Sequence, residues 1–335
     1  MNWADRFNNF CFLDNNNYEF GKSSFECILA AGASRSIQLT PGNAYPDLKA
    51  FYQSNPSWVF GHFSYELKNE TEVLPVDDLP RISFGPGFFF MPSIVIKLGD
   101  GKLSITSTME DPARVMKSIE ECVGLMIPSV ATDVSIKHSI SRDDYIENVK
   151  KLIGHIHRGD CYEINYCQHF FAKDAIIDPL YIYKQLTDFS PNPFAALYKL
   201  NNKYCLCASP ERYLKKTGHT IFSQPMKGTS RRLPGDDFKD AESRKYLLNS
   251  NKEKSENVMV VDLVRNDLSK ICVEGSVKVD ELFGIYTFPQ VHQMISTISG
   301  ILKPGIHWTD AIKATFPMGS MTGAPKKKVM ELISR

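Results

Sequence analysis

The sequence predicts an α+β fold, in which antiparallel sheets built from hairpin-linked strands pack against helices. Short runs with strand character follow one another closely, as in residues 203–208, 212–216 and 220–223, and a Thr-Gly-His turn links the last two. Hairpin connections of this kind favour an antiparallel sheet over a doubly wound parallel one. Segments with helical spacing are grouped apart from the strands, which is typical of the α+β class.

The first region, residues 1–135, is rich in aromatic residues, prolines and short strand-like runs. A Leu-Gly-Asp-Gly-Lys sequence in this region is typical of a hairpin turn. We expect strands over residues 58–65 and 93–98, the hairpin turn over 98–102, a helix over 111–126 and a connection to the second region over 128–135.

The second region, residues 136–335, begins with a clear helix. Ser141 and Asp144 form a capping-box pattern, an apolar stripe follows at helical spacing, and Gly159 ends it. Further along the chain we expect strands over residues 161–171, 203–208, 212–216, 220–223 and 276–299, mainly helix over 238–268, and a helix over 308–315.

The composition is that of a soluble globular protein. The chain has 335 residues, of which 43% are hydrophobic and 23% charged, and its net charge is +1. This balance argues against nucleic acid or an anionic membrane as a partner. We see neither a secretory signal nor a run that could span a bilayer, so we expect a cytoplasmic protein. We expect the eight cysteines to be reduced, with no disulfide and no structural metal.

Lys227 lies in the segment Gln-Pro-Met-Lys-Gly-Thr, which is well suited to nucleophilic chemistry. Gly228 lets the backbone approach a ligand closely, and Thr229 adds a hydroxyl and an amide beside the amine. A lysine taken alone is far more often a solvated surface charge. A nucleophile needs the neutral amine, which burial or a nearby cation such as Arg231 or Arg232 would favour.

Glu211 is a candidate general acid. It follows Pro210 at the point where one predicted strand gives way to the next, so its backbone freedom is limited. A carboxylic acid held there could protonate a leaving hydroxyl. A salt bridge to Arg212 or another neighbour is an equally good interpretation.

Glu253 and Glu256 are a candidate metal site. They are three residues apart in a helical segment, so their carboxylates share a face. Mg²⁺ binds one or two protein carboxylates and completes its coordination with water and substrate. On the residues alone, a solvated charged face is the better interpretation, and Lys252 and Lys254 support it.

Two later segments combine charged or small residues with a helix. Asp262, Arg265 and Asp267 can satisfy one another within a buried helix, which we favour over a catalytic role. Residues 319–326 place small side chains before Pro325, a favoured first helical position, and amides at such a start can bind an anion. The P-loop spacing is missing, so a carboxylate is a better candidate than a nucleotide triphosphate.

Together these segments resemble the chorismate-utilising enzymes, and within them the aminodeoxychorismate (para-aminobenzoate) synthases. The resemblance extends from about Ser141 to the end of the chain. Six ordered motifs carry it, at residues 159–165, 208–212, 225–229, 256–267, 291–297 and 316–326. Residues 60–68 resemble the family's amino-terminal domain more loosely, which implies a structural or partner-binding role for residues 1–135.

The resemblance implies a fold of largely antiparallel sheets packed as a sandwich with helices outside, and a chorismate-binding catalytic region over residues 136–335. In the chemistry that it implies, Lys227 adds to C2 of chorismate, and ammonia then displaces it to give 4-amino-4-deoxychorismate for p-aminobenzoate and folate synthesis. Glu211 is implied to be the general acid for the departing C4 hydroxyl. Glu256 is implied as the first Mg²⁺ ligand, with Glu253 at or beside the metal. The implied substrate-binding residues are Gly228, Thr229, His292, Gln293, Ser320, Thr322, Gly323 and Ala324.

The chain departs from the family pattern in three places. Relatives often have histidine where this chain has Gln293, and the adjacent His292 should point to the opposite face of a strand. The family's catalytic domain continues past the position of Arg335, so the resemblance implies a region that is incomplete at its carboxyl end. Residues 25–27 do not match the Leu-Glu-Ser segment of tryptophan-regulated relatives, so we do not expect feedback control by tryptophan.

The sequence also bears on the ammonia source and on alternative functions. We see no glutaminase nucleophile motif, so the resemblance implies a separate glutamine amidotransferase subunit.

Anthranilate synthases typically have alanine at the position before Gly228, so Lys227 favours the aminodeoxychorismate branch over this alternative. Isochorismate and salicylate synthases activate water with a lysine in the strand after the first helix, where this chain has Glu163. The alternative from another class is a non-catalytic paralogue that binds chorismate or the amidotransferase.

Overall fold

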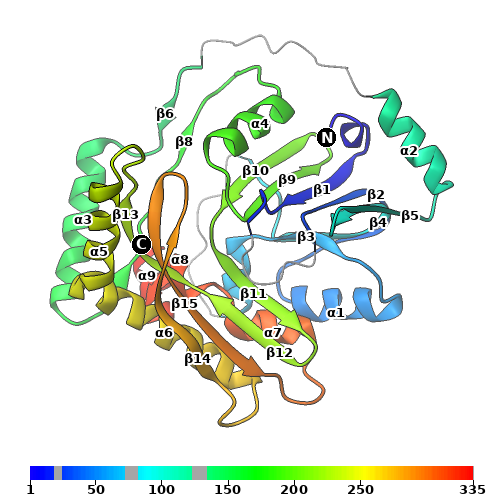
Figure 1. The fold of residues 1–335 in the computed structure, drawn as a ribbon. Coiled ribbons are helices and arrows are strands. Elements are labelled where there is room, and N and C mark those ends of the chain that lie inside the picture. The colour runs from blue at the N-terminus through cyan, green and yellow to red at the C-terminus, as the bar shows by residue number, and fades with distance from the viewer. Residues whose placement is uncertain (19–24, 72–81, 123–133, 335) are drawn as a thin grey trace. The chain divides into compact units, whose positions relative to one another are not determined.

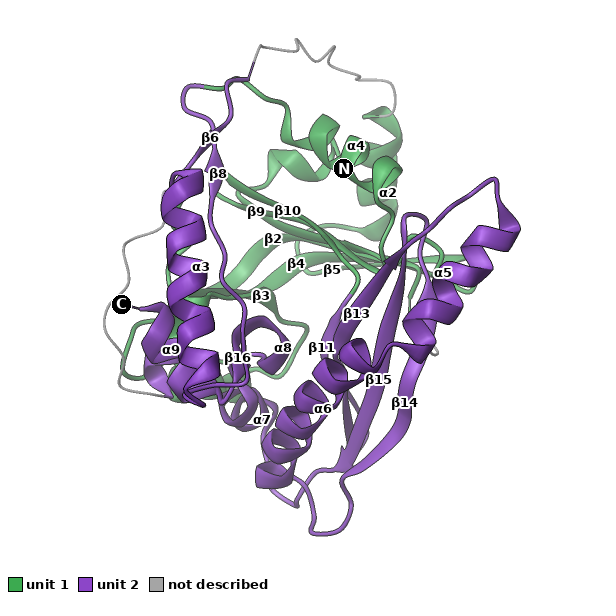
Figure 2. Cartoon of the chain, turned by 90° about the vertical axis from the view of Figure 1, so that its left-hand side faces the viewer, with its two compact units in different colours: residues 1–67, 79–133, 175–210 green, residues 68–78, 134–174, 211–335 purple. Residues whose placement is uncertain are grey.

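The computed structural model describes residues 1–18, 25–71, 82–122 and 134–334. The chain forms two compact units that are interleaved along the sequence, as Figure 2 shows. Unit 1 comprises residues 1–67, 79–133 and 175–210, and unit 2 comprises residues 68–78, 134–174 and 211–335. Within the described ranges, no helix is both long and apolar enough to cross a membrane.

Unit 1 contains, in its described residues, a seven-stranded antiparallel sheet with the order β10-β9-β1-β2-β4-β3, and β5 pairs with β4 (Figure 1). Its strands are β1 (Asn9–Asp14), β2 (Cys27–Gln38), β3 (Phe60–Phe63), β4 (Gly87–Gly99), β5 (Lys102–Ser107), β9 (Phe194–Leu200) and β10 (Lys203–Ser209). Its helices are η1 (Ala4–Arg6), α1 (Ala44–Ser54), α2 (Pro112–Glu121) and α4 (Pro179–Phe189), and η2 (Tyr65–Glu70) lies at a boundary between the units.

The core of unit 1 forms where α2 and α4 meet one face of this sheet. Val115 of α2 and Tyr183 of α4 pack in one cluster with Phe10, Ile94 and Leu197 from three strands. Alternation along each strand gives the sheet this apolar face, and the burial of these side chains stabilises the fold.

Unit 2 contains a second antiparallel sheet with the order β11-β12-β15-β13, and β14 pairs with the other edge of β15. Its strands are β11 (Arg212–Thr217), β12 (Thr220–Gln224), β13 (Met226–Arg231), β14 (Lys278–Thr287) and β15 (Val291–Ile301). Two small pairings join β6 (Lys137–His138) to β8 (Phe170–Phe171), and β7 (Glu163–Ile164) to β16 (Gly323–Ala324). The helices are α3 (Arg142–His157), α5 (Asp237–Asn249), α6 (Asn251–Ile271), α7 (Trp308–Thr315), α8 (Gly319–Thr322) and α9 (Lys326–Ile333).

Helices α5 and α6 pack against β13 and β15, so one face of the unit 2 sheet is covered (Figure 1). Val261, Val264 and Leu268 of α6 form an apolar cluster with Ile221 and Ile298 of the sheet. The carboxyl-terminal half of α6 therefore fixes this helix to the sheet, and its first turn extends beyond the cluster.

The α+β class, the largely antiparallel sheets and most predicted elements are confirmed. The hairpin turn at Asp100 and Gly101 has positive φ at both residues, as a type I′ turn requires. Ser141 caps α3 by accepting the amide of Asp144, and α7 has the predicted bounds. Residues 123–126 of the predicted helix and 128–133 of the predicted connection lie outside the described residues.

Two local predictions need correction, for residues 161–171 and for Pro325. Residues 161–171 do not form one strand, because β7 and β8 pair with different partners and are separated by irregular chain. Residues 238–268 are mainly helix, as predicted, and α5 and α6 are divided there by Ser250, which caps α6 by accepting the amide of Glu253. Pro325 is the residue before α9 and not its first residue, with an extended ψ of 140°.

The units do not follow a single division of the sequence. One crossing between them falls at residues 133/134, next to the predicted boundary at 135. Residues 175–210 return to unit 1 because β9 pairs with β1 in the sheet of that unit.

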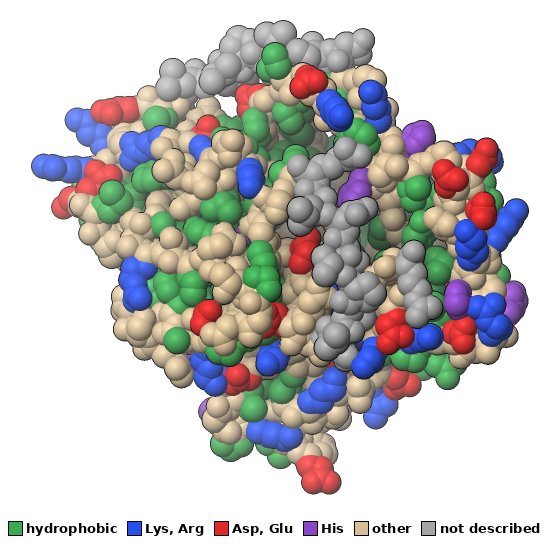
Figure 3. Space-filling model, turned by 180° about the vertical axis from the view of Figure 1, so that it is seen from behind, with side chains coloured by type: hydrophobic (Ala, Val, Ile, Leu, Met, Phe, Trp, Pro, Cys, Tyr) green, Lys and Arg blue, Asp and Glu red, His purple; other side chains and the backbone are tan. Residues whose placement is uncertain are grey.

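The described part of the chain has free thiols at all eight cysteines. Lys and Arg side chains lie among Asp and Glu on the face shown in Figure 3, which matches the net charge of +1.

Candidate active site

One face of the unit 2 sheet is covered by helices, and the opposite face carries a polar pair from two strands. Thr229 of β13 lies opposite Gln293 of β15, and its hydroxyl donates to Gln293 Oε1 at 2.8 Å. His292 points the other way, because successive residues of a strand alternate. It is buried, 3.2 Å from Asp240 Oδ1 of α5 and 3.0 Å from Thr287 Oγ1. The structure thus joins Thr229 and Gln293 and separates His292 from them.

Lys227 reaches from β13 to the short strand β7. Its Nζ forms an ion pair with Glu163 and donates to Asn165 Oδ1 at 3.1 Å. The side chains of Lys227 and Glu163 are only 17% and 14% exposed, so the pair is largely shielded from water. Sequence reasoning gave Asn165 no role of its own. The two-residue spacing from Glu163 was the available signal, because it puts both side chains on one face of an extended segment.

Glu211 lies between β10 and β11, as predicted, and its Oε1 accepts the backbone amide of Met226 at 3.1 Å. Burial raises the pKa of the Glu211 carboxyl above its ordinary value. The Ser320 hydroxyl, the Met226 amide and the charge of Lys227 oppose this rise without cancelling it. A carboxyl that keeps its proton to higher pH beside a lysine is suited to general acid catalysis.

Two arginines near these residues in the sequence are bound to other groups. Arg212 donates to the Gln224 side chain at 2.6 Å. Arg232, which we expected to favour the neutral amine of Lys227, pairs with Asp240 of α5 at 2.9 Å. The carboxylate of Glu163 is therefore the charged group that the structure puts in contact with Lys227.

The backbone of β13 is bent at the position that directs Lys227. Pairing with β15 is irregular between Met226 and Thr229, and Gly228 has a φ of +97°. A Cβ at Gly228 would lie 3.2 Å from the Cβ atoms of Glu253 and Met294. Both the dihedral angle and the space therefore require glycine, which brings the strand close to the first turn of α6.

Asn257 of α6 holds the same bend from the helix side. Its Nδ2 donates to the Lys227 carbonyl at 3.2 Å, and its Oδ1 accepts the Ser296 hydroxyl at 2.6 Å. Asn257 is 1% exposed and Ser296 is fully buried. Sequence reasoning did not identify this link, because the three residues are separated along the chain and carry no motif of their own.

Glu253 and Glu256 lie in the first turns of α6 with their carboxylates directed to a common point. Lys252 Nζ lies 3.2 Å from Glu253 Oε1 and 3.1 Å from Glu256 Oε1. The predicted common face is therefore present, and one cation already bridges both carboxylates. The described residues contain no group of three or more His, Cys, Asp or Glu side chains that could hold a metal ion. A metal here would take its remaining ligands from substrate and water.

Residues 319–324 brace β7 mainly through backbone groups. The Asn165 side chain donates to the Ser320 carbonyl at 2.8 Å, and the Tyr162 amide donates to the Ala324 carbonyl at 2.8 Å. Gly323 has a φ of +128°, and a Cβ there would lie 2.2 Å from the Glu163 carbonyl oxygen. This segment therefore sets the position of the strand that carries Glu163 and Asn165.

The predicted substrate-binding groups in this segment are partly engaged within it. The Thr322 hydroxyl donates to the carbonyls of Met318 and Gly319 at 3.3 and 3.2 Å, and the Gly323 amide also donates to Gly319. Ser320 is buried near Glu211, as its effect on that carboxyl indicates. Of these groups in the described residues, Ser320 is the one that lies beside Glu211.

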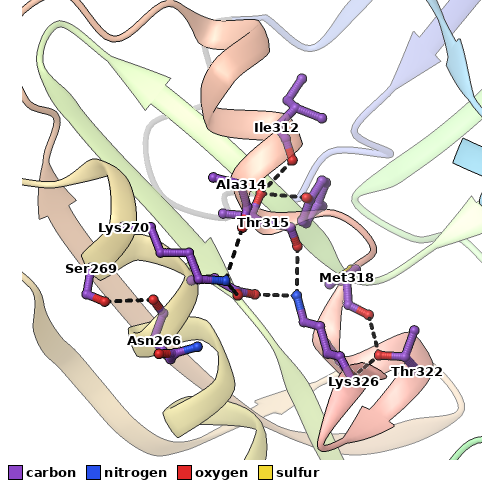
Figure 4. Close-up of polar contacts among 12 residues, drawn as sticks. Asn266, Ser269, Lys270, Ile312, Ala314, Thr315, Met318, Thr322 and Lys326 are labelled. Carbon is purple, nitrogen blue, oxygen red and sulfur yellow. Dashed lines mark hydrogen bonds and ion pairs between the residues drawn. The ribbon is translucent and has the colours of Figure 1, made fainter. Parts of the chain in front are cut away.

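Lys326 lies in a separate polar network, drawn in Figure 4. Its Nζ forms an ion pair with Asp267 of α6 and donates to the Thr315 carbonyl at 2.8 Å. Lys270 binds the other oxygen of Asp267 at 3.0 Å. The prediction that Asp262, Arg265 and Asp267 satisfy one another is therefore only partly correct. Arg265 pairs with Asp262 at 2.9 Å, but Asp267 pairs with two lysines.

This network borders a cavity of about 720 Å³ within unit 2. Asn266, Asp267 and Lys270 of α6 line it together with Lys326 and residues of α7. Lys227, Glu211 and the two carboxylates of the first turn of α6 are not part of its lining. The cavity and the Lys227 cluster are therefore distinct features of the same unit.

The sequence matches the model of the chorismate binding enzyme family over residues 10–335, so the chain belongs to this family. Aminodeoxychorismate synthase component 1 of Klebsiella aerogenes is 33% identical over 278 residues, which cover 82% of this chain and 60% of that protein. The protein of the same name from Escherichia coli K12 is 40% identical over 195 residues, covering 58% and 43%. Anthranilate synthase component 1 of Archaeoglobus fulgidus is 33% identical over 217 residues, covering 65% and 52%. The chain thus spans between 43% and 60% of the length of these three relatives.

Solved structures show the same fold. Anthranilate synthase component I from Streptococcus pneumoniae superposes with a TM-score of 0.76 at 21% identity, covering 95% of this chain and 79% of that one. The menaquinone-specific isochorismate synthase of Escherichia coli gives a TM-score of 0.71 at 14% identity, covering 100% and 74%. The predicted chorismate-utilising fold is confirmed.

Proposed function

We propose that this member of the chorismate binding enzyme family converts chorismate and ammonia to 4-amino-4-deoxychorismate, a precursor of p-aminobenzoate and folate. The observation that carries the proposal is the shielded Lys227 amine close to the buried Glu211 carboxyl. One group is a potential nucleophile, and the other keeps its proton to raised pH. Relatives named aminodeoxychorismate synthase component 1, at 33% and 40% identity, support this branch of the family.

In the proposed reaction, Lys227 and Glu211 act at the two reacting carbons of chorismate. The Lys227 amine adds to C2, the ring double bond shifts, and the C4–O bond breaks. Glu211 gives its proton to the leaving hydroxyl, so that water departs. Ammonia then adds at C4, and the C2–Nζ bond breaks to release the lysine. In this proposal, Gly228, Thr229, Gln293 and Ser320 orient the substrate.

We further propose that Glu256 and Glu253 hold Mg²⁺. The two carboxylates fit such an ion, because the Lys252 ammonium already bridges them at 3.1 and 3.2 Å and is itself 73% exposed, so it can move away. When bound, Mg²⁺ would neutralise the ring carboxylate of chorismate and draw electron density from C2. Two protein ligands suit an ion that keeps water and substrate in its coordination shell.

The metal site can be tested by binding as well as by turnover. Titration calorimetry with Mg²⁺ in the presence of chorismate should give binding to the wild type and loss of binding in Glu256→Gln. Glu274→Gln, a change at an exposed carboxylate, is the matched control. Equal Mg²⁺ binding by all three proteins would remove this pair from the metal site.

We propose a separate glutamine amidotransferase subunit as the source of ammonia. The name "component 1" of the relatives supports a partner subunit. Ammonium salts should replace such a partner in vitro, so the reaction at Lys227 can be measured without it.

The test is an assay of purified full-length protein with chorismate, Mg²⁺ and ammonium, with the products separated by chromatography. We expect 4-amino-4-deoxychorismate from the wild type and from Lys216→Ala, which changes an exposed lysine of β11. Lys227→Ala should make none. Failure to consume chorismate, even with a glutaminase added, would favour a non-catalytic binding protein.

Anthranilate is the second candidate product. The fold shared with an anthranilate synthase component I and the 33% identical relative of that name favour it as the alternative. Release of anthranilate by the wild type in the same assay would establish this activity in place of the first.

A further inference from the structure

Glu163 is a buried carboxylate that the reaction proposed above does not use. Its Oε1 forms the ion pair with Lys227 Nζ. Its Oε2 is buried and has no hydrogen-bond partner among the described residues. A buried carboxylate oxygen without a partner costs free energy, so this arrangement is expensive for a purely structural salt bridge.

Among the described residues, Lys227 is the charged group recorded in direct contact with Glu163. Lys227 approaches it from β13, and Glu211, from the connection between β10 and β11, acts on Lys227. β16, which pairs with β7, contributes only Gly323 and Ala324. A proton that leaves the Lys227 ammonium therefore has one carboxylate in direct contact to receive it, since Glu211 keeps its own proton to raised pH.

We propose that Glu163 is the proton acceptor that converts the Lys227 ammonium to the nucleophilic amine. The inference rests on the proposed function, in which Lys227 must lose a proton before it adds to C2. Nζ shares its proton with the carboxylate that it already contacts, and no proton leaves the pair for solvent.

The proton balance closes over one cycle. The proton moves from Nζ to Glu163, and the amine then forms the C2–N bond while the C4–O bond breaks with the proton of Glu211. When ammonia adds at C4, the C2–Nζ bond breaks and Lys227 leaves with the electron pair. Glu163 then returns its proton to Nζ. The new ammonium on C4 gives up a proton, and this restores the acid form of Glu211 directly or through solvent.

The first test is the pH dependence of Glu163→Gln relative to the wild type, at the same ammonium concentration, so that ionisation of ammonia cancels in the ratio. In the Gln variant Lys227 must release its proton to solvent, and an ordinary lysine does so near pH 10. We expect kcat/KM for chorismate to be about 10²-fold lower than the wild type at pH 7 and to approach it by about pH 9. A ratio that stays constant with pH would overturn the proposal.

Glu163→Asp is the conservative control. It keeps a carboxylate on the same strand, so we expect a lower kcat but a ratio to the wild type that does not change with pH. A ratio that rises with pH, as in the Gln variant, would contradict the assigned role.

A second measurement does not depend on turnover. Trinitrobenzenesulfonate reacts with neutral amines, and mass spectrometry of the Lys227 peptide measures its rate. Both reactions need the neutral amine, so if Glu163 accepts the Nζ proton, Lys227 should react more slowly in Glu163→Gln than in the wild type at pH 7, in the same direction as turnover. Equal rates would mean that Glu163 does not control the proton on Lys227. If the wild type consumes no chorismate, the proposed function fails, while this rate still reports on the pair.

Discussion

Unit 2 contains two shielded lysine–carboxylate pairs, and their surroundings differ. Lys326 is 14% exposed and pairs with one oxygen of Asp267, and the other oxygen of Asp267 binds Lys270. Lys326 also donates to the Thr315 carbonyl (Figure 4). Lys227 is 17% exposed and pairs with Glu163, whose second oxygen has no partner among the described residues. Both lysines lie in motifs of the family, but only the first pair satisfies both carboxylate oxygens.

This difference separates a pair with both carboxylate oxygens bound from one that fits the proposed reactive role. A buried ion pair is stabilised only when further hydrogen bonds satisfy its remaining donors and acceptors. The Asp267 network meets this condition and ties α6 to the start of α9 and the end of α7. Burial lowers the pKa of Lys326, and Asp267 opposes that shift. The Glu163 pair does not meet this condition among the described residues, and it lies near the Glu211 carboxyl, whose pKa is raised by burial.

The largest effect on stability is expected from opening the satisfied network. Asp267→Ala would leave the Lys326 ammonium shielded from water without its ion-pair partner, and we expect it to lower the free energy of unfolding by about 3–5 kcal/mol. Urea unfolding measures this change. Asp262→Ala is the control on the same helix, because the Asp262–Arg265 pair is exposed, and it should cost less than about 1 kcal/mol. Equal losses in both variants would mean that the Asp267 network is not structural.

The next effect concerns the bend of β13 at Gly228, which directs Lys227 to Glu163. Gly228→Ala places a Cβ at a φ of +97° and 3.2 Å from Glu253 and Met294, so we expect a loss of about 2–4 kcal/mol. Gly218→Ala is the matched control, because its φ is +59° but a Cβ there would meet nothing within 4 Å. That variant should lose about 1–2 kcal/mol. A loss at Gly228 no larger than at Gly218 would show that close packing against α6 does not matter.

The sequence predicted features that depend on neighbouring residues better than contacts between residues that are far apart in the chain. The turn at Gly218 and the helix over residues 308–315 follow from neighbouring residues, and both were predicted. Residues 161–171 were predicted as one strand, and the separate pairing of β7 within them was missed because its partner is Gly323–Ala324, far away in sequence. The motif around Lys227 identified the lysine and Glu211 directly. The partners Asp267 and Lys326 lie 59 residues apart, and no local pattern joins them.

A smaller effect is expected at Asn257, which holds the Lys227 carbonyl from α6. Asn257→Ala removes the side-chain donor to this carbonyl and the acceptor of the buried Ser296 hydroxyl, at a cost of about 1–3 kcal/mol. Because the bend at Lys227 would relax, turnover should also fall while KM for chorismate changes little. Ser255→Ala, an exposed change on the same helix, should alter stability by about 0.5 kcal/mol or less. Steady-state kinetics and urea unfolding of both variants make the comparison.

The smallest effect is the pH dependence of stability that Glu211, near the Lys227 pair, should cause. Burial raises the pKa of Glu211 beside Lys227, so the native state binds this proton more tightly than the unfolded chain. The stability that the proton supplies is complete below the unfolded value near 4.3 and is lost as pH rises through the higher native value. Glu211→Gln stays neutral at every pH, so its stability relative to the wild type should rise as the pH increases from 5 to 8. Thermal unfolding at both pH values measures the gain, with Glu274→Gln as the exposed control. A difference from the wild type that does not grow with pH would mean that Glu211 is ionised in the native protein, and the pair beside it would then lack its general acid.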